Sequence, residues 1–210
     1  MKTTLFNALL LGLVTFSGCN SGSSNKIQTI EDSPTTTTAT TDHASAPNDE
    51  DLKVVNARFT DVDAKVTGSI KEVVEHYGHL KNALANDDAK EAGAAAKALN
   101  EAFTKVDQAS LDEEQKAVLK DNGDDLKEMA EHITKKPGDI VHQREHFAIL
   151  SEDVYAIVKA FGAGKTLYHY HCPMYNKNRG ALWLSESKEI ENPYFGSKMP
   201  KCSELKEVIK

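Results

Sequence analysis

Apolar residues recur at every third or fourth position between Thr60 and Gly162, and this spacing strongly limits what the chain can fold into. One such run extends from Val66 to Leu84, and similar runs follow after short polar connections. Side chains with this spacing lie along one stripe of a helix. Four amphipathic helices with short connections pack as an up-down-up-down bundle. The sequence therefore predicts a mainly α-helical domain, a four-helix bundle over residues 51–164.

Signals for helix ends accompany this pattern. Ser110 with Glu113 is predicted to form a capping box at the start of the third helix. Pro137 and Gly138 end that helix, and Asp139 is placed to cap the fourth. We therefore expect the third and fourth helices to be joined by only a few residues.

The first 18 residues have the layout of a bacterial signal peptide. An apolar core from Ala8 to Phe16, too short to cross a bilayer of roughly 30 Å, leads through small residues to Cys19. We predict a lipoprotein signal peptide over residues 1–18 and lipidation of Cys19. Asn20 is compatible with sorting to the outer membrane, so the predicted location is lipid-anchored and facing the periplasm. An ordinary secretory peptide followed by an incidental cysteine is the alternative.

Residues 19–50 are rich in serine and threonine and contain almost no large apolar side chains. Such a segment cannot bury enough apolar surface to fold. A flexible chain of about 30 residues has a mean reach of roughly 30 Å. The segment is therefore predicted to be a tether between the lipidated cysteine and the helical domain.

Aromatic residues, prolines and glycines become frequent after Lys165, which is unlike bundle sequence. Residues 167–171 and 181–185 are predicted to form a short β-hairpin, and residues 203–209 a closing helical turn. Residues 165–210 are thus expected to form a small appendage packed on the bundle.

Charge divides the chain at the same point. Residues 50–164 carry a net charge of −8, whereas residues 165–210 carry +3. The appendage is therefore expected to dock electrostatically on the helices. The whole chain has a net charge of −7 and no basic stripe, which excludes nucleic acid as an expected partner.

The appendage collects thiols, thioethers and imidazoles within a short segment. Sulfur ligands favour monovalent copper or silver, whereas zinc accepts thiolate and imidazole but rarely methionine. We therefore predict a site for Cu(I) or Ag(I). Its expected ligands are Cys172, Met174, Met199 and Cys202, with His169 or His171 as further candidates.

A disulfide bond between Cys172 and Cys202 is the competing interpretation, because an exported protein meets an oxidising compartment. Closing a loop of this size would stabilise the appendage by roughly 3 to 4 kcal/mol. The alternative function is then a disulfide-stapled protein-interaction domain without metal.

Histidines on the predicted helices form a second, weaker candidate metal site. His142 and His146 are spaced i, i+4, and His76 and His79 are spaced i, i+3, so either pair can present two imidazoles to one ion. His132 on the third helix could reach the same region. Since all of them flank the apolar stripes, simple contacts at the border of the core are the alternative.

An enzyme is not expected. Cys172 with His169 or His171 could supply a nucleophile and a base, but no orienting third residue or oxyanion element can be named. The sequence has no Cys-x-x-Cys pair and no Gly-rich phosphate loop, and no organic cofactor is predicted.

Several motifs resemble one known family. They are Gln143-Arg144-x-x-Phe147, Leu150-Ser151, Cys172-Pro173-Met174, Asn178-x-Gly180-Ala181-x-Trp183-Leu184-Ser185, Asn192-Pro193-Tyr194-x-Gly196 and Met199-x-x-Cys202. In their order they resemble an uncharacterised exported helical domain (domain of unknown function, DUF 3347) of Bacteroidota lipoproteins, associated with copper and silver efflux adaptors of the CusB type. Tyr170-x-Cys172-Pro173-Met174 is similar to the heavy-metal-binding segment of such adaptors. The resemblance implies a metal-resistance context: a periplasmic chaperone, buffer or efflux accessory with a heavy-metal efflux adaptor as partner, held to the membrane through its lipid anchor only.

Overall fold

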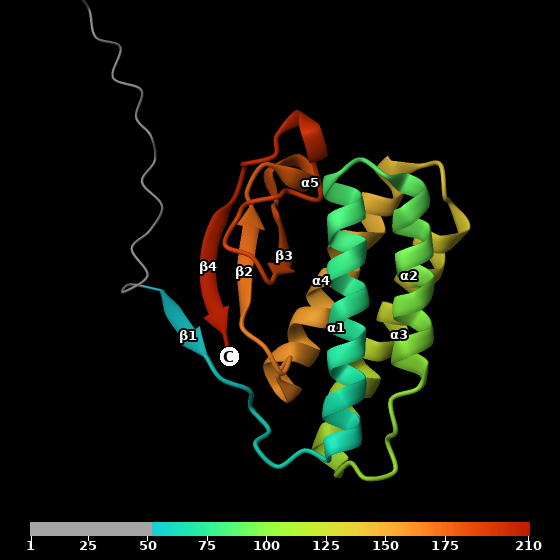
Figure 1. Ribbon diagram of the computed structural model, residues 1–210, viewed down its shortest axis with the longest axis vertical. Helices are drawn as coiled ribbons and strands as arrows, with labels where there is room; N and C mark the ends of the chain where they lie inside the picture. The colour runs from blue at the N-terminus through green and yellow to red at the C-terminus, as the bar shows by residue number, and fades with distance from the viewer. Residues whose placement is uncertain (1–51) are drawn as a thin grey trace, which may run out of the picture. The chain divides into compact units, whose positions relative to one another are not determined.

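The computed structural model describes residues 52–210 as four long helices beside a four-stranded sheet (Figure 1). The long helices are α1 (Ala64–Ala85), α2 (Ala89–Thr104), α3 (Glu113–Lys135) and α4 (Ile140–Phe161). The prediction of a mainly helical chain with a small β-element near the C-terminus is confirmed, while the up-down-up-down order stays a prediction. The predicted signal peptide, Cys19 and the tether lie outside the described residues.

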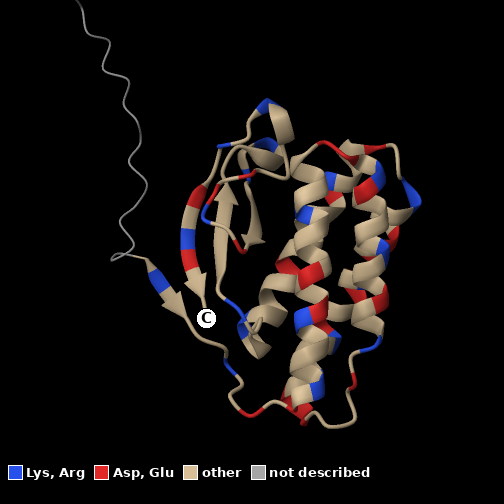
Figure 2. Ribbon diagram, in the orientation of Figure 1, with Lys and Arg blue, Asp and Glu red and all other residues tan. Residues whose placement is uncertain are grey.

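The helices form because each has one apolar stripe and a polar face. In α1, the residues Val66, Ile70, Val73, Tyr77 and Leu80 are almost completely buried. Contacts join α1 to α2, α2 to α3, and α3 to α4. Figure 2 shows acidic and basic residues interspersed along α1 and α2, where they form exposed pairs such as Lys97 with Glu101 at 3.0 Å.

Helix ends follow the predicted signals in part. Asp139 caps α4 as expected, and its carboxylate accepts a hydrogen bond from the His142 backbone N–H at 3.1 Å. The capping box of α3 is formed by Asp112 and Gln115, so the prediction that placed it at residues 110 and 113 was wrong. The helix begins two residues later because the Asp112 carboxylate reaches the third backbone N–H of the helix.

No helix within residues 52–210 has the length and the apolar character that crossing a bilayer requires.

The sheet has the strand order β1-β4-β2-β3. Its strands are β1 (Lys53–Val55), β2 (Leu167–Cys172), β3 (Ala181–Ser185) and β4 (Glu204–Ile209). The pair β2 and β3 is the predicted hairpin, joined through the single turn α5 (Tyr175–Asn178). β4 pairs antiparallel with β2 and parallel with β1. A short 3₁₀ turn, η2 (Gly196–Lys198), lies between β3 and β4.

The predicted helical turn over residues 203–209 was wrong, because residues 204–209 of that range form β4. A single helical turn would satisfy few backbone groups, whereas β4 gains ladder hydrogen bonds on both sides, from β1 and from β2. β1 also extends the sheet beyond the appendage, since Lys53–Val55 precede all of the helices.

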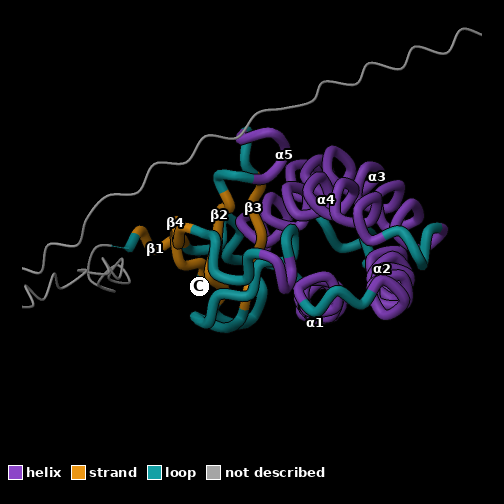
Figure 3. Tube along the Cα trace, turned by 90° about the horizontal axis from the view of Figure 1, so that it is seen from above, coloured by secondary structure: helices purple, strands orange, loops and turns teal. Residues whose placement is uncertain are grey.

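The sheet meets the helices through β3. Figure 3, which views the fold from above, shows β3 nearest to the helices and β1 at the far edge. Trp183 of β3 is fully buried, and the backbone N–H of Leu184 donates to the Tyr77 hydroxyl at 3.1 Å. The same hydroxyl lies 2.9 Å from Oγ of Ser151 on α4. Apolar burial and this hydrogen-bond chain therefore hold the C-terminal segment on the helices.

Candidate metal centre

Three histidines converge where α3 ends and α4 begins. His132, His142 and His146 each offer a ring nitrogen, and these three atoms all lie within 4.8 Å of one another. The His132 and His146 rings are stacked with centroids 4.4 Å apart, and the His142 and His146 centroids are 4.3 Å apart. No other group of three His, Cys, Asp or Glu ligand atoms this close is present within residues 52–210.

Local structure explains the convergence. The cap at Asp139 starts α4 so that His142 and His146 lie one turn apart on the same face. The connection between the helices is short, so His132 in the last turn of α3 lies beside them. The buried amide of Gln143 donates to the backbone carbonyls of Ile133 at 3.2 Å and Ala89 at 2.8 Å, which fixes the start of α4 against α3.

A thioether completes the cluster. The Met129 sulfur lies 3.1 Å from Nδ1 of His146, and Met129 precedes His132 by nearly one helical turn. The Nε2 atom of His142 is buried and has no hydrogen-bond partner among the described residues. A buried ring nitrogen that has no hydrogen-bond partner could instead coordinate a bound metal ion. We call Met129, His132, His142 and His146 the His-Met cluster.

The electrostatic environment of the cluster favours the neutral, metal-binding form of His146. Burial lowers the pKa of His146, and the neighbouring His142 and His132 lower it further. The neutral imidazole is the form that binds metal, so His146 needs to lose no proton near neutral pH. Glu128 lies 3.7 Å from Nε2 of His132 and supplies a negative charge at the rim. Three nitrogens and one sulfur from two rigid helices suit a soft or borderline ion.

Cys172 and Cys202, the thiols of the predicted tail site, are also brought together. Both are free, and their sulfur atoms are 3.6 Å apart. Main-chain contacts place both predicted methionines beside Cys202: its backbone N–H donates to the Met199 carbonyl at 3.4 Å, and the Met174 backbone hydrogen-bonds its sulfur. The Met174 side chain is half exposed.

The structure does not bring His169 and His171 to these thiols. Adjacent side chains of a strand point to opposite faces, and Cys172 follows His171 in β2. The His169 ring lies 4.5 Å from that of Tyr155 and 3.5 Å from the Glu207 carboxylate. In the part of the chain that the structure describes, no close group of three His, Cys, Asp or Glu ligands contains a cysteine.

The second predicted pair of helical histidines stays separate as well. His76 and His79 lie on α1 with ring centroids 6.0 Å apart, and His76 faces Glu72 at 4.0 Å. They do not join His142 and His146. The partner of those two is His132, which the sequence indicated only as a residue within reach.

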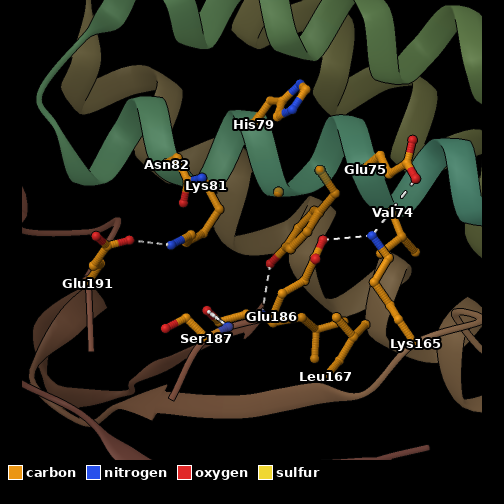
Figure 4. Close-up of a pocket in the computed structure, with 14 residues that line it drawn as sticks. Val74, Glu75, His79, Lys81, Asn82, Lys165, Leu167, Glu186, Ser187 and Glu191 are labelled. Carbon is orange, nitrogen blue, oxygen red and sulfur yellow. Dashed lines mark hydrogen bonds and ion pairs between the residues drawn. The ribbon is translucent and has the colours of Figure 1, made fainter. Parts of the chain in front are cut away.

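A cavity of about 430 Å³ between α1 and β3 is a further candidate site (Figure 4). Lys81 pairs there with Glu191 at 2.9 Å, and Lys165 pairs with Glu186 at 2.7 Å. Because these ion pairs balance both lysines, the cavity favours no particular class of ligand.

The fold and cluster define a mainly helical domain with a small sheet and a candidate metal centre between two helices. Residues 73–166 match the family model described as "Protein of unknown function (DUF3347)", which supports the family resemblance over that segment. The match includes the whole His-Met cluster and ends before β2. No curated protein and no solved structure matches the chain significantly. The association with efflux adaptors and with Bacteroidota lipoproteins stays a prediction.

Proposed function

We propose that this protein is an exported, lipid-anchored protein that binds a copper or silver ion at the His-Met cluster and acts as a periplasmic chaperone, buffer or efflux accessory. The observation that carries the proposal is the convergence of three histidine nitrogens within 4.8 Å, with a thioether sulfur 3.1 Å from one of them. The sequence motifs that resemble efflux-associated proteins supply the cellular context.

The ligand atoms of the His-Met cluster favour a copper or silver ion. Imidazole nitrogen suits copper, zinc and nickel, and a thioether shifts the preference toward Cu(I) and Ag(I). The carboxylates near the cluster, which hard ions require, are Glu128, 3.7 Å from Nε2 of His132 at the rim, and Glu145, which acts on His146 through its charge. Zinc is thus the main competing ion, and Met129 is the residue that distinguishes a copper or silver site from a zinc site.

Exposure of the site favours carrying an ion over a structural role. All three histidines are partly exposed, so an ion could enter and leave without unfolding of the helices. An efflux adaptor as receiving partner, and anchoring through Cys19 in the outer membrane, complete the proposal.

An anaerobic Cu(I) competition titration of the full chain tests the site. We expect one high-affinity site that is lost in His142→Ala and His146→Ala. The matched control is His76→Ala with His79→Ala, which removes two histidines from α1 and should leave the affinity unchanged. Loss of the site in Cys172→Ser with Cys202→Ser, but not in the cluster variants, would assign the ion to the tail. Absence of any site in the wild type would favour the disulfide-stapled interaction domain.

Replacing the thioether separates a copper site from a zinc site. Met129→Leu keeps the volume and apolar character of this buried side chain. We expect the Cu(I) affinity to fall by about tenfold or more, with little change in Zn(II) affinity. Equal losses for both ions would contradict a role for the Met129 sulfur as a ligand.

A further inference from the structure

The two free thiols of the C-terminal segment differ in their access to solvent. Cys172 ends β2 and is completely buried, whereas Cys202 lies two residues before β4 and is partly exposed. The two strands pair antiparallel, and His171 opposite Glu204 is the last register pair at this end of the ladder. The thiols therefore lie together at a fixed end of the sheet.

Their separation allows a bond after a small movement. The sulfurs are 3.6 Å apart, compared with about 2.0 Å in a disulfide bond. The backbone near Cys202 is held in place, since the Asn192 side-chain amide donates to the Cys202 carbonyl at 2.7 Å. Side-chain rotation, with slight adjustment of the loop before β4, can bring the sulfurs into contact.

We propose that Cys172 and Cys202 form a thiol–disulfide exchange site for low-molecular-weight disulfides, with Cys202 as the attacking thiol and Cys172 as the resolving thiol. The exposure of the two residues assigns the roles, because Cys202 is partly exposed and Cys172 is completely buried. An incoming disulfide can reach Cys202 from solvent, but it cannot reach Cys172 without opening of the sheet.

The exchange balances in two steps. The Cys202 thiolate attacks one sulfur of the disulfide R–S–S–R, forms a mixed disulfide, and releases one R–S⁻. The Cys172 thiolate then attacks Cys202 Sγ, forms the Cys172–Cys202 bond and releases the second R–S⁻. The two cysteines lose two electrons and two protons. The disulfide is reduced to two thiols, which accept the protons.

Glutathione disulfide is a suitable probe, with the products identified by mass spectrometry of the full chain. All variants carry Cys19→Ala, which removes the one cysteine outside the described residues. With both thiols present, we expect loss of two protons and no lasting adduct. In Cys172→Ser the mixed disulfide at Cys202 should accumulate. In Cys202→Ser the adduct at Cys172 should form more slowly by about tenfold or more.

Circular dichroism confirms that each variant is folded, and Cys172→Ala replaces Cys172→Ser if the buried hydroxyl disturbs folding. Equal adduct rates at the two positions would overturn the assigned roles. Two stable adducts on the chain with both thiols, or persistent free thiols under excess glutathione disulfide, would overturn the exchange site itself. Neither step of the thiol–disulfide exchange uses the His-Met cluster, so the copper titration and the exchange experiment can fail independently.

Discussion

Asp153 on α4 is a carboxyl group in an unfavourable environment. Its Oδ2 atom is buried and has no hydrogen-bond partner among the described residues. Burial raises its pKa to about 7, and the nearby carboxylates of Asp125 and Glu152 contribute to the rise. The folded state therefore favours the protonated carboxyl, and ionisation at higher pH opposes folding.

Replacing this carboxyl should stabilise the protein at alkaline pH. The folded pKa of about 7 lies above the ordinary value of 3.8, so stability is lost as pH rises between these values. Asp153→Asn should therefore raise the free energy of unfolding at pH 8 by about 1 to 2 kcal/mol, a value reduced for solvent screening, and change it little at pH 4. Urea unfolding at both pH values measures this. Asp121→Asn on exposed α3 surface is the control, and an equal gain there would contradict the explanation.

At the same scale, the candidate site could be predicted only in part. The spacing of His142 and His146 places them on one face whatever the helix packs against. The participation of His132, and above all of Met129, depends on which faces of α3 and α4 meet. The available signal was the i, i+3 spacing of Met129 and His132 just before the turn at Pro137.

Among the elements, α2 and α3 approach closely at Gly123. A Cβ atom there would lie 2.6 Å from Cζ of Phe103, a buried ring of α2. Gly123→Ala should therefore destabilise the protein by about 1 to 2 kcal/mol, because the overlap outweighs the higher helix propensity of alanine. Thermal or chemical unfolding provides the measurement.

Gly68 provides the matched control. It is an exposed helical glycine on α1, and a Cβ atom there would meet nothing within 4 Å. Gly68→Ala should stabilise the protein by about 0.5 to 1 kcal/mol. If both substitutions stabilised the protein, the close packing of α2 on α3 would not limit the size of the side chain at Gly123.

The elements also differ in how well their sequence predicts them. The long helices and the β2–β3 hairpin depend on patterns within short segments, and their existence was predicted. β1 and β4 were not, because their pairing joins residues 53–55 to residues 207–209. The local sequence around Glu204 favours a helical turn. Only pairing with the neighbouring strands makes the extended form more stable.

Across the whole molecule, Arg144 connects three separate parts of the chain. Its guanidinium donates to the carbonyls of Leu84 and Pro193 and to the Asp87 carboxylate, each at 2.7 Å. Asp87 in turn accepts hydrogen bonds from Ser197, which together with Arg144 lower its pKa to about 2. The turn after α1, the start of α4 and the loop before β4 thus share one polar network, buried at Arg144 and exposed at Asp87 and Ser197.

Loss of this network should weaken the whole fold. Arg144→Lys keeps the charge, but its one ammonium nitrogen cannot reach acceptors that the planar guanidinium contacts through two separate nitrogens, Nε and Nη2. We expect the free energy of unfolding to fall by about 2 to 4 kcal/mol in chemical denaturation. Arg179→Lys is the control, because Arg179 is exposed and its side chain bonds to nearby Asn176. Similar losses for both variants would contradict a special role for Arg144.

The parallel pairing of β1 with β4 also sets an order of assembly. Contacts between successive helices close short loops, whereas β1 must close a loop of about 150 residues to find its partner. During synthesis the helices can associate while β4 has yet to emerge, and until then one edge of β2 remains unpaired. An unpaired strand edge is a template for joining other chains. The last strand to arrive therefore determines how long a newly made molecule remains prone to aggregation.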